Sequence, residues 1–283
     1  MDRFSTSLLG EAKTLLLATD GSDFSEGAVQ EAIFFGQSCA AKVVALHVVR
    51  IEAESLKSAN ATVMRRQTQV APHLEKIRRM AQDSGVECET VVVGSSVPEH
   101  AIVEQARMRR ADVILMGRHG RAGRLYLMVG SMTAKVIGLG FPLVMVLPKD
   151  SLRTGTHVLV AVEDSDSSRQ AVEEALSLGE CCQTLERLTF VAVTKRPGGL
   201  DAARRMVEDV CARGRDRWPN FAFEAVAEVG HPSNVIVRAA EERGVDMIMI
   251  GGVNGGPLPR MFTGRVTKEV CGWAHCAVLV VTA

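Results

Sequence analysis

The segments that decide the fold are Thr-Leu-Leu-Leu-Ala-Thr-Asp-Gly-Ser-Asp-Phe-Ser at residues 14–25 and His-Val-Leu-Val-Ala-Val-Glu-Asp-Ser-Asp-Ser-Ser at residues 157–168. Each segment is an apolar run, followed by an acidic residue and then by small polar residues that can cap a helix. Two such beginnings in one chain indicate a repeated unit, and a repeat changes how every other motif is interpreted.

The repeat continues through the rest of the chain. Three further landmarks recur in the same order: residues 93–103 as 229–237, residues 111–117 as 245–251, and residues 141–147 as 276–281. Between the two copies lies a polar segment that starts at Pro148. We therefore expect one domain at residues 1–148, a second at residues 156–283, and a linker at residues 149–155.

Short apolar runs alternate with amphipathic stretches within each copy. Val70, Leu74, Ile77 and Ala81 follow one another at three- and four-residue spacing, which is typical of the buried face of a helix. The expected strands lie near residues 14–19, 42–49, 86–93, 112–117 and 142–147, and near residues 157–162, 186–193, 221–229, 245–250 and 277–281. Alternating strands and helices form parallel sheets with right-handed crossovers. The sequence thus predicts an α/β protein with two tandem five-stranded, parallel, doubly wound, Rossmann-like domains.

A glycine-rich loop lies in residues 112–131, Asp-Val-Ile-Leu-Met-Gly-Arg-His-Gly-Arg-Ala-Gly-Arg-Leu-Tyr-Leu-Met-Val-Gly-Ser. Its apolar run ends at Gly117, Gly120 follows, and Gly130-Ser131 opens a segment that is typical of a helix. Glycines let a backbone approach a ligand closely, and the N–H groups at a helix start suit phosphate. Three arginines in the same loop could meet an anion: Arg118, Arg121 and Arg124. We interpret this loop as a phosphate-binding site.

Two other residues of the loop have alternative roles. The Ser131 hydroxyl could hold a terminal phosphate, or cap the helix, or do both. His119 could touch phosphate or carry a proton, but the sequence shows no partner that would make it a catalytic base. We therefore assign no catalytic residue.

Asp20 follows the first strand, at the sheet edge where doubly wound folds bind their ligands. Its carboxylate could accept a hydrogen bond from a sugar hydroxyl or a base amine, or it could cap the following helix. The glycine loop emerges at the same edge, which favours a ligand. At the end of the second strand, the backbone of Val48 could pair with an adenine edge, whereas His47 is best interpreted as a core histidine with satisfied hydrogen bonds.

The composition excludes several classes of protein. The 283 residues include 33 basic and 33 acidic side chains, so a nucleic-acid binder that relies on a generally basic surface is not expected. No apolar stretch approaches the roughly 18 residues of a membrane span, and the N-terminus does not resemble a signal peptide. The cysteines number seven and form no Cys-x-x-Cys pair. We expect reduced thiols and a cytoplasmic location.

Familiar catalytic and nucleotide-binding motifs are missing from the chain. It contains no Gly-x-x-x-x-Gly-Lys-Ser/Thr and no His-Glu-x-x-His. No Gly-x-Gly-x-x-Gly follows the first strand, which disfavours NAD.

The chain resembles the tandem two-domain form of the universal stress protein family. Gly117-x-x-Gly120, nine further residues and then Gly130-Ser131 fit that family's Gly-2x-Gly-9x-Gly-Ser/Thr ATP-binding motif without a mismatch. Asp20 after the first strand and His47-Val48 at the second fit as well. The resemblance spans nearly the whole chain and implies an adenine nucleotide α-hydrolase-like fold.

Membership of this family implies an ATP site in the first copy. Asp20 and the backbones of Ala18 and Val48 would serve adenine and ribose. The residues implied for the phosphate side are Gly117, Arg118, His119, Gly120, Arg121, Gly130, Ser131 and Met132. A Mg²⁺ ion would be held mainly by the phosphates, so no metal ligands are expected from the protein.

The second copy departs from the family pattern. Glu163 stands in place of the aspartate, and Gly264 is followed by Arg265 instead of Ser or Thr. The glycine spacing is broken, and two prolines in the loop, Pro257 and Pro259, remove N–H donors that a phosphate would need. We expect the second copy to bind nucleotide poorly or not at all.

The resemblance also implies how the domains assemble and what they do. Domains of the family pair through their last strands, so residues 143–147 and 278–281 would pair within one chain and form a pseudo-dimer. A further homodimer and an unidentified protein partner are compatible with this arrangement. The leading hypothesis is a nucleotide-sensing stress-response module. The alternatives are a slow ATPase and a binding scaffold that uses no nucleotide.

Overall fold

The computed structural model describes residues 9–52, 56–118, 129–150, 155–182, 184–252 and 264–282. In its first half the elements run in the order β1 (Thr14–Ala18), α1 (Glu26–Ser38), β2 (Lys42–Arg50), α2 (Leu56–Asp83), β3 (Cys88–Ser95), α3 (Pro98–Met108), β4 (Val113–Gly117), α4 (Ser131–Gly138) and β5 (Leu143–Leu147). The second half repeats this order with β6 (His157–Ala161), α5 (Asp166–Cys181), β7 (Arg187–Thr194), α6 (Leu200–Arg217), β8 (Ala222–Val229), α7 (Pro232–Glu242), β9 (Met247–Gly251), α8 (Arg265–Trp273) and β10 (Ala277–Val281). Residues 151–154 of the expected linker lie outside the described ranges.

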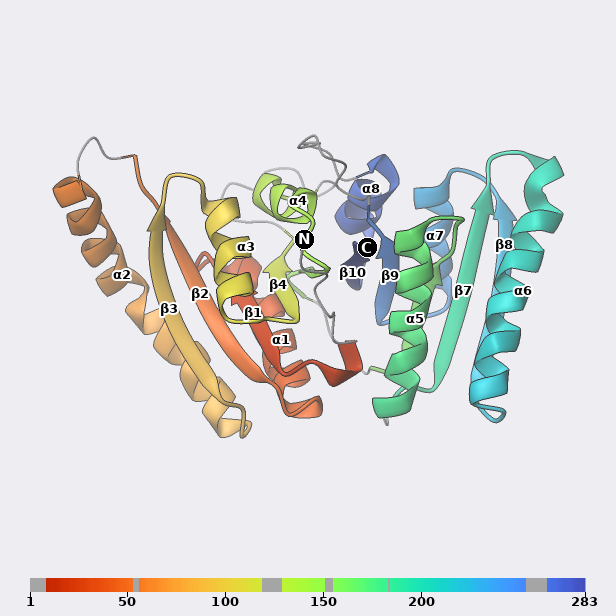
Figure 1. Ribbon diagram of the computed structural model, residues 1–283, viewed down its shortest axis with the longest axis horizontal. Helices are drawn as coiled ribbons and strands as arrows, with labels where there is room; N and C mark the ends of the chain where they lie inside the picture. The colour runs from red at the N-terminus through yellow and green to blue at the C-terminus, as the bar shows by residue number, and fades with distance from the viewer. Residues whose placement is uncertain are drawn as a thin grey trace.

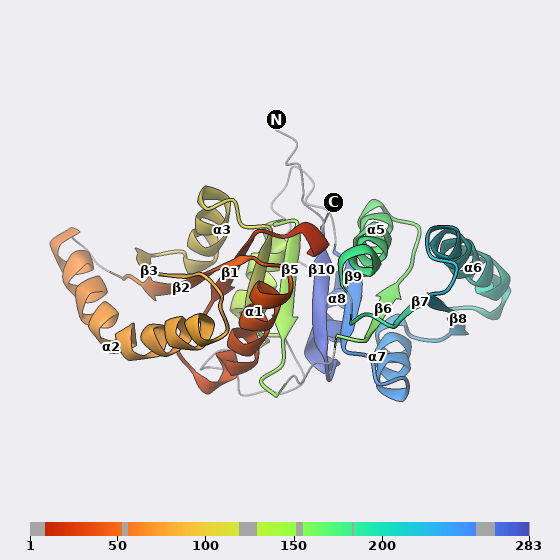
Figure 2. The same ribbon diagram turned by 90° about the horizontal axis from the view of Figure 1, so that it is seen from below.

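The ten strands in the described residues form one sheet, in the order β3-β2-β1-β4-β5-β10-β9-β6-β7-β8. Within each half, neighbouring strands are parallel, as the alternation of strands and helices predicts. The two halves meet where β5 and β10 pair antiparallel, with Leu143 opposite Val281 and Val146 opposite Val278. Figure 1 shows the two halves on either side of this central pair, and Figure 2 shows β5 and β10 side by side from below. The predicted pairing of the last strands is confirmed.

The sheet is covered on both faces. On one face, a cluster of buried side chains packs the strands against α1, α2, α5 and α6. On the other, a second cluster packs them against α3, α4, α7 and α8. Each cluster contains residues from both halves of the chain, so the core continues across the β5–β10 junction. Burial on both faces explains why the strands read as continuous apolar runs.

An aspartate precedes the fourth strand of each half and holds the start of the first strand of that half. The Asp112 carboxylate accepts hydrogen bonds from the backbone N–H groups of Lys13 and Thr14, at 2.8 and 2.9 Å. Asp246 accepts the equivalent bonds from Thr156 and His157, at 2.8 and 2.9 Å. Each aspartate therefore satisfies the two N–H groups at the start of the first strand in its half.

The third strand begins at Cys88, two residues later than the predicted 86–93. Gly85 has a φ of 71°, and the N–H of Val86 donates to the carbonyl of Ala81 at 2.8 Å. These contacts close the C-terminal turn of α2, so Val86 still belongs to the helix end.

Among the described residues, we find no helix with the length and hydropathy needed to cross a membrane.

The backbone of residues 148–149 packs closely against Gly27 in α1, and a substitution at Gly27 tests this contact. A Cβ atom at this position in α1 would lie 2.1 Å from the carbonyl oxygen of Pro148 and 2.9 Å from that of Lys149. Replacing a helical glycine by alanine ordinarily stabilises a helix by about 0.5–1 kcal/mol. Here we expect Gly27→Ala to lower the free energy of unfolding by about 1–3 kcal/mol, because the backbone of the following segment must move.

The measurement is urea unfolding of the full chain, with Gly198→Ala as the matched control. A Cβ atom at Gly198 meets no atom within 4 Å, so that variant should stay within about 0.5 kcal/mol of the parent. Equal stability of the two variants would show that residues 148–149 do not pack on α1 as described.

Candidate functional site

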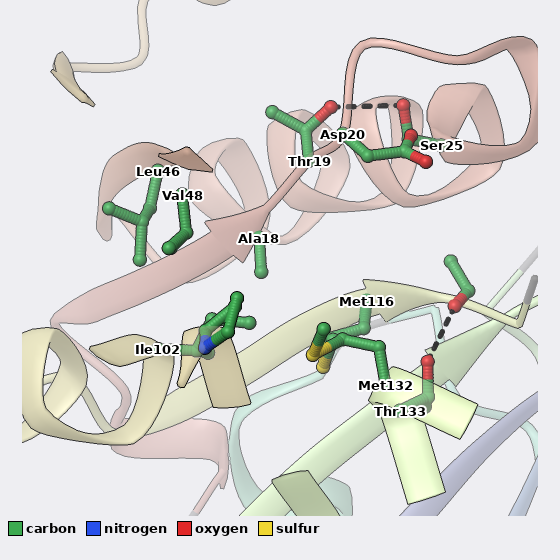
Figure 3. Close-up of a pocket in the computed structure, with 12 residues that line it drawn as sticks. Ala18, Thr19, Asp20, Ser25, Leu46, Val48, Ile102, Met116, Met132 and Thr133 are labelled. Carbon is green, nitrogen blue, oxygen red and sulfur yellow. Dashed lines mark hydrogen bonds between the residues drawn. The ribbon is translucent and has the colours of Figure 1, made fainter. Parts of the chain in front are cut away.

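A cavity of about 190 Å³ opens at the carboxyl ends of β1, β2 and β4, where α3 and α4 begin. Figure 3 shows the side chains around it. The cavity is lined by Ala18, Thr19, Asp20, Ser25, Leu46, Val48, Pro98, Ile102, Met116, Gly117, Met132 and Thr133. Strand ends of a parallel sheet are the expected place for a ligand, because the turns that follow them leave backbone groups exposed.

Asp20 is held at the rim of the cavity by its own turn. Its Oδ1 accepts hydrogen bonds from the backbone N–H of Ser22 at 2.9 Å and from the Ser22 hydroxyl at 2.6 Å. Gly21 has a φ of 73°, a conformation that favours glycine, and it turns the chain away from β1. The carboxylate therefore stabilises the turn before α1. The N-cap of α1 is Ser25, which makes no side-chain capping bond.

A short chain of hydroxyl groups lies behind Asp20. Thr19 and Ser25 are buried, and the Thr19 hydroxyl donates to Ser25 Oγ at 3.0 Å (Figure 3). Ser25 Oγ in turn donates to the carbonyl of Ser22 at 2.8 Å. This chain fixes the polar rim of the cavity. Neither Thr19 nor Ser25 was predicted as a site residue, because a hydroxyl side chain near a strand end belongs to no known motif by itself.

The opposite walls of the cavity are apolar. Leu46 and Val48 come from β2, Ile102 from α3 and Met116 from β4. Together with Ala18, they form the apolar part of the wall between the sheet and α3. Ala18 and Val48 were predicted as site residues, and both line the cavity. Leu46, Ile102 and Met116 also line it and were not predicted as site residues.

The glycine loop returns to its starting point at the far end of the cavity. The N–H of Gly130 donates to the carbonyl of Arg118 at 2.7 Å, which brings Gly130 beside Gly117 although twelve residues separate them. The Thr133 hydroxyl donates to the Gly117 carbonyl at 3.1 Å (Figure 3). Gly130 is the N-cap of α4 and provides no side-chain cap. The first N–H groups of α4, with the positive end of the helix dipole, therefore stand at this end of the site.

The predicted phosphate residues other than Arg118 divide into three groups. Gly117 and Met132 line the cavity, and Thr133, which we did not predict, lines it beside them. Gly130 and Ser131 lie next to it at the start of α4, with Ser131 exposed. His119, Gly120 and Arg121 lie outside the described residues.

Arg118 extends away from the cavity toward the second half of the chain. Its Nη1 donates to the carbonyl of Ala274, the C-cap of α8, at 2.7 Å. Burial lowers the pKa of its guanidinium from the ordinary value. The carbonyl at a helix C-terminus stabilises this cation through the helix dipole. In this arrangement Arg118 connects the glycine loop of one half to a helix of the other.

His47 is half-buried and hydrogen-bonded. Its Nδ1 lies 2.9 Å from the carbonyl oxygen of Thr19. The hydrogen bond fits the predicted histidine with a satisfied partner, but His47 is not a core residue, since it lines a cavity beside Asp20.

The second half contains an equivalent but smaller cavity of about 100 Å³. Ala161, Val193, Pro232, Ile236, Gly251 and Thr267 occupy the places of Ala18, Val48, Pro98, Ile102, Gly117 and Thr133. The Thr267 hydroxyl donates to the Gly251 carbonyl at 3.2 Å, as Thr133 does to Gly117. Glu163, in the place of Asp20, is exposed.

The two cavities differ most at the polar rim and at the helix start. Val162 replaces Thr19, which removes a hydroxyl group, and Val266 replaces Met132. Arg265, the first residue of α8, pairs with Glu269 at 2.7 Å. Residues 253–263, which include Pro257 and Pro259, lie outside the described ranges. In the part of the chain that the structure describes, no three His, Cys, Asp or Glu side chains are grouped to hold a metal ion.

Comparison with solved structures supports the fold. A universal stress protein from Archaeoglobus fulgidus superposes with a TM-score of 0.75 at 19% identity, over 96% of this chain and 99% of that one. A functionally unknown protein, PA1789 from Pseudomonas aeruginosa PAO1, superposes with a TM-score of 0.71 at 13% identity, over 97% and 94% of the two chains. At these identities, the likeness shows the tandem fold and nothing about the ligand.

Sequence comparison places both halves in one family. Universal stress protein MJ0531 of Methanocaldococcus jannaschii is 33% identical over 131 residues, covering 44% of this chain and 75% of that protein. Universal stress protein YxiE of Bacillus subtilis is 28% identical over 138 residues, covering 43% of this chain and 89% of that protein. The model of the universal stress protein family matches residues 11–146 and again residues 155–282. The chain therefore belongs to the universal stress protein family, with two tandem copies of its domain.

Proposed function

We propose that the first half of the chain binds ATP in the cavity at the ends of β1, β2 and β4, and that the bound nucleotide regulates a cytoplasmic stress-response module. The observation that carries this proposal is the return of the glycine loop. The Gly130–Arg118 bond sets the N-terminus of α4 beside Gly117, and Asp20 lines the same cavity.

The proposed pose follows from the polarity of the walls. The adenine ring would lie between Ile102 and the ends of β1 and β2, with the backbones of Ala18 and Val48 at its edge. Asp20 would accept a hydrogen bond from the ribose. The phosphates would then extend toward Gly117, Gly130 and the start of α4, whose N–H groups favour negative charge.

The remaining predicted residues belong to the same phosphate end. Ser131 and Met132 open α4, and His119, Gly120 and Arg121 come from the intervening loop of the motif. A Mg²⁺ ion would be carried by the phosphates, since the described residues provide no metal-ligand group. Arg118 contributes through its backbone in this proposal, because its guanidinium is bonded to Ala274.

We further propose that each chain binds one nucleotide. The cavity of the second half has about half the volume of the cavity in the first half. It lacks a hydroxyl group in the place of Thr19, and Glu163, in the place of Asp20, is exposed. Arg265, at the start of α8, stands in the place of Ser131 and forms an ion pair with Glu269. The output of the module would be a change of conformation that a protein partner or a second chain detects.

The stoichiometry of ATP binding tests the proposal. Equilibrium dialysis of the full chain with Mg-ATP should give one ATP per chain. We expect Gly130→Val to weaken binding at least about tenfold, because its side chain would stand at the α4 N-terminus where a phosphate would lie. Gly264→Val is the matched control, since Gly264 precedes α8 with nearly the same backbone angles, φ −50° and ψ 150° against −56° and 145°.

Three results would contradict this assignment. Two ATP molecules per chain, or a loss of binding in Gly264→Val alone, would place a functional site in the second half. Failure of millimolar Mg-ATP to bind or to raise the melting temperature would favour the nucleotide-free scaffold.

The slow-ATPase alternative depends on His119, because phosphoryl transfer to water needs a residue that orients the attacking water. Purified protein incubated with ATP for hours should release ADP no faster than buffer if the nucleotide is only sensed. Steady ADP release that is lost in His119→Ala, with ATP binding retained, would establish the enzyme instead.

A further inference from the structure

A cavity of about 240 Å³ lies between the two halves of the chain, and we call it the junction cavity. From the first half it is lined by the C-terminal end of α1 and by Gly10 of a short 3₁₀ helix, η1 (Leu9–Glu11). From the second half it is lined by the end of α5 and by the amino ends of β6 and β9. The proposed nucleotide site lies at the carboxyl ends of the strands, and among the described residues the two sites share no lining side chain.

The walls of the junction cavity are apolar and include aromatic rings. Phe34 and Phe35 line it from α1, with ring centroids 6.1 Å apart and ring planes at 89° to each other. Val158, Leu185 and Met247 line it from the second half, and all three are buried. Such walls bind a ligand by burying its apolar surface and by edge-to-face contacts with its rings.

The C-terminal ends of two equivalent helices border the junction cavity. Cys39 is the C-cap of α1, Cys182 is the C-cap of α5, and both residues line the cavity. Figure 2 shows α1 and α5 on either side of the β5–β10 pair. The last turn of a helix carries the negative end of the helix dipole. The cavity therefore lies beside two negative helix ends, one from each half.

The electrostatics of the junction cavity favour an uncharged ligand. Asp246 lines it, and its Oδ2 accepts hydrogen bonds from the N–H groups of Thr156 and His157 at 2.8 and 2.9 Å and from the Thr156 hydroxyl at 3.1 Å. An anion would meet this carboxylate and the two helix ends as like charges. A cation would lose its hydration among side chains that are mostly apolar.

We propose that the junction cavity binds a small uncharged aromatic molecule of one or two fused rings. An apolar cavity of about 150 Å³ lined by Leu, Ile and Phe binds benzene, so a cavity of about 240 Å³ accepts a larger ring system such as indole. The rings would lie between Phe34 on one side and Leu185 and Met247 on the other. The thioether of a methionine adds a favourable contact with an aromatic ring.

A ligand in this position would connect the two halves. The halves already touch here, because η1 packs against α5 and a Cβ atom at Gly155 would lie 3.6 Å from Cζ of Phe34. The ligand would add contacts to both sides of this junction in the folded chain alone. A molecule that binds the folded state and not the unfolded state raises the melting temperature as its concentration rises.

Calorimetry and thermal unfolding of the full chain with phenol and with indole test the proposal. Two analogues isolate the effect of charge, since indole-3-carboxylate is an anion, tryptamine is a cation, and both keep the indole ring. We expect indole to bind and to raise the melting temperature, and each charged analogue to bind at least about tenfold more weakly. The measurement contains no ATP, so its result is independent of the proposed nucleotide function.

The rate of cysteine alkylation locates the bound ligand. Cys182 lines the junction cavity, whereas Cys88, which is also half-buried, lies on β3 outside it. With indole at about ten times its dissociation constant, alkylation of Cys182 by N-ethylmaleimide should slow about tenfold. The rate at Cys88 should stay unchanged, which makes it the internal control.

A pair of phenylalanine variants tests the aromatic wall. Phe34→Ala should weaken indole binding about tenfold or more, because it removes a ring that faces the cavity. Phe221→Ala is the matched control, since Phe221 is also partly buried against the same apolar cluster but does not line the cavity.

Four results would overturn the proposal. These are no binding of phenol or indole, binding of either charged analogue as tight as that of indole, equal protection of Cys182 and Cys88, and equal affinity in the Phe34 and Phe221 variants. Tight binding of tryptamine would identify a site for an aromatic cation instead.

Discussion

The antiparallel pairing of β5 with β10 is the contact on which the rest of the molecule depends. Both strands are buried along their whole length, and either one alone would be an apolar sheet edge with unpaired N–H and carbonyl groups. Pairing them satisfies these groups and continues both core layers from one half to the other. A hydroxyl group reinforces the junction, since Thr282 Oγ1 donates to the Phe141 carbonyl at 2.6 Å.

This junction also determines the surroundings of the glycine loop. β4 lies next to β5, and β9 lies next to β10, so the residues directly after β4 and β9, Arg118 and Gly252, lie close to the opposite half. Arg118 takes advantage of this proximity and reaches Ala274. The equivalent residue, Gly252, has no side chain, and a Cβ atom there would lie 2.7 Å from Thr282 Cγ2. Among the described residues, Arg118 therefore reaches α8 of the second half, and Gly252 makes no equivalent side-chain contact with the first half.

The asymmetry between the halves is larger than the glycine motif indicates. A repeated fold keeps the backbone turns at the strand ends, which is why Gly251 and Thr267 reproduce the contacts of Gly117 and Thr133. The polar groups have diverged instead. Val162, Ala192 and Glu163 stand in the places of Thr19, His47 and Asp20. Val162 and Ala192 belong to the buried apolar core, and Glu163 is exposed.

The sequence by itself determined the repeat, the order of strands and helices, and the sheet edge that holds the site, because these follow from hydrophobic periodicity and from glycine and aspartate at strand ends. It also pointed to Ala18, Asp20, Val48 and Gly117, which line one cavity. Only the tertiary structure decided where long or buried side chains point. Arg118 reads as a phosphate ligand in the sequence, but its guanidinium reaches a helix end of the other half, 156 residues away. Thr19, Ser25 and Thr133 have no motif of their own, and their hydroxyl groups acquire a role only when the chain brings them to one rim. The physical reason is that periodicity fixes which face a residue occupies, whereas its partner depends on distant segments that packing brings together.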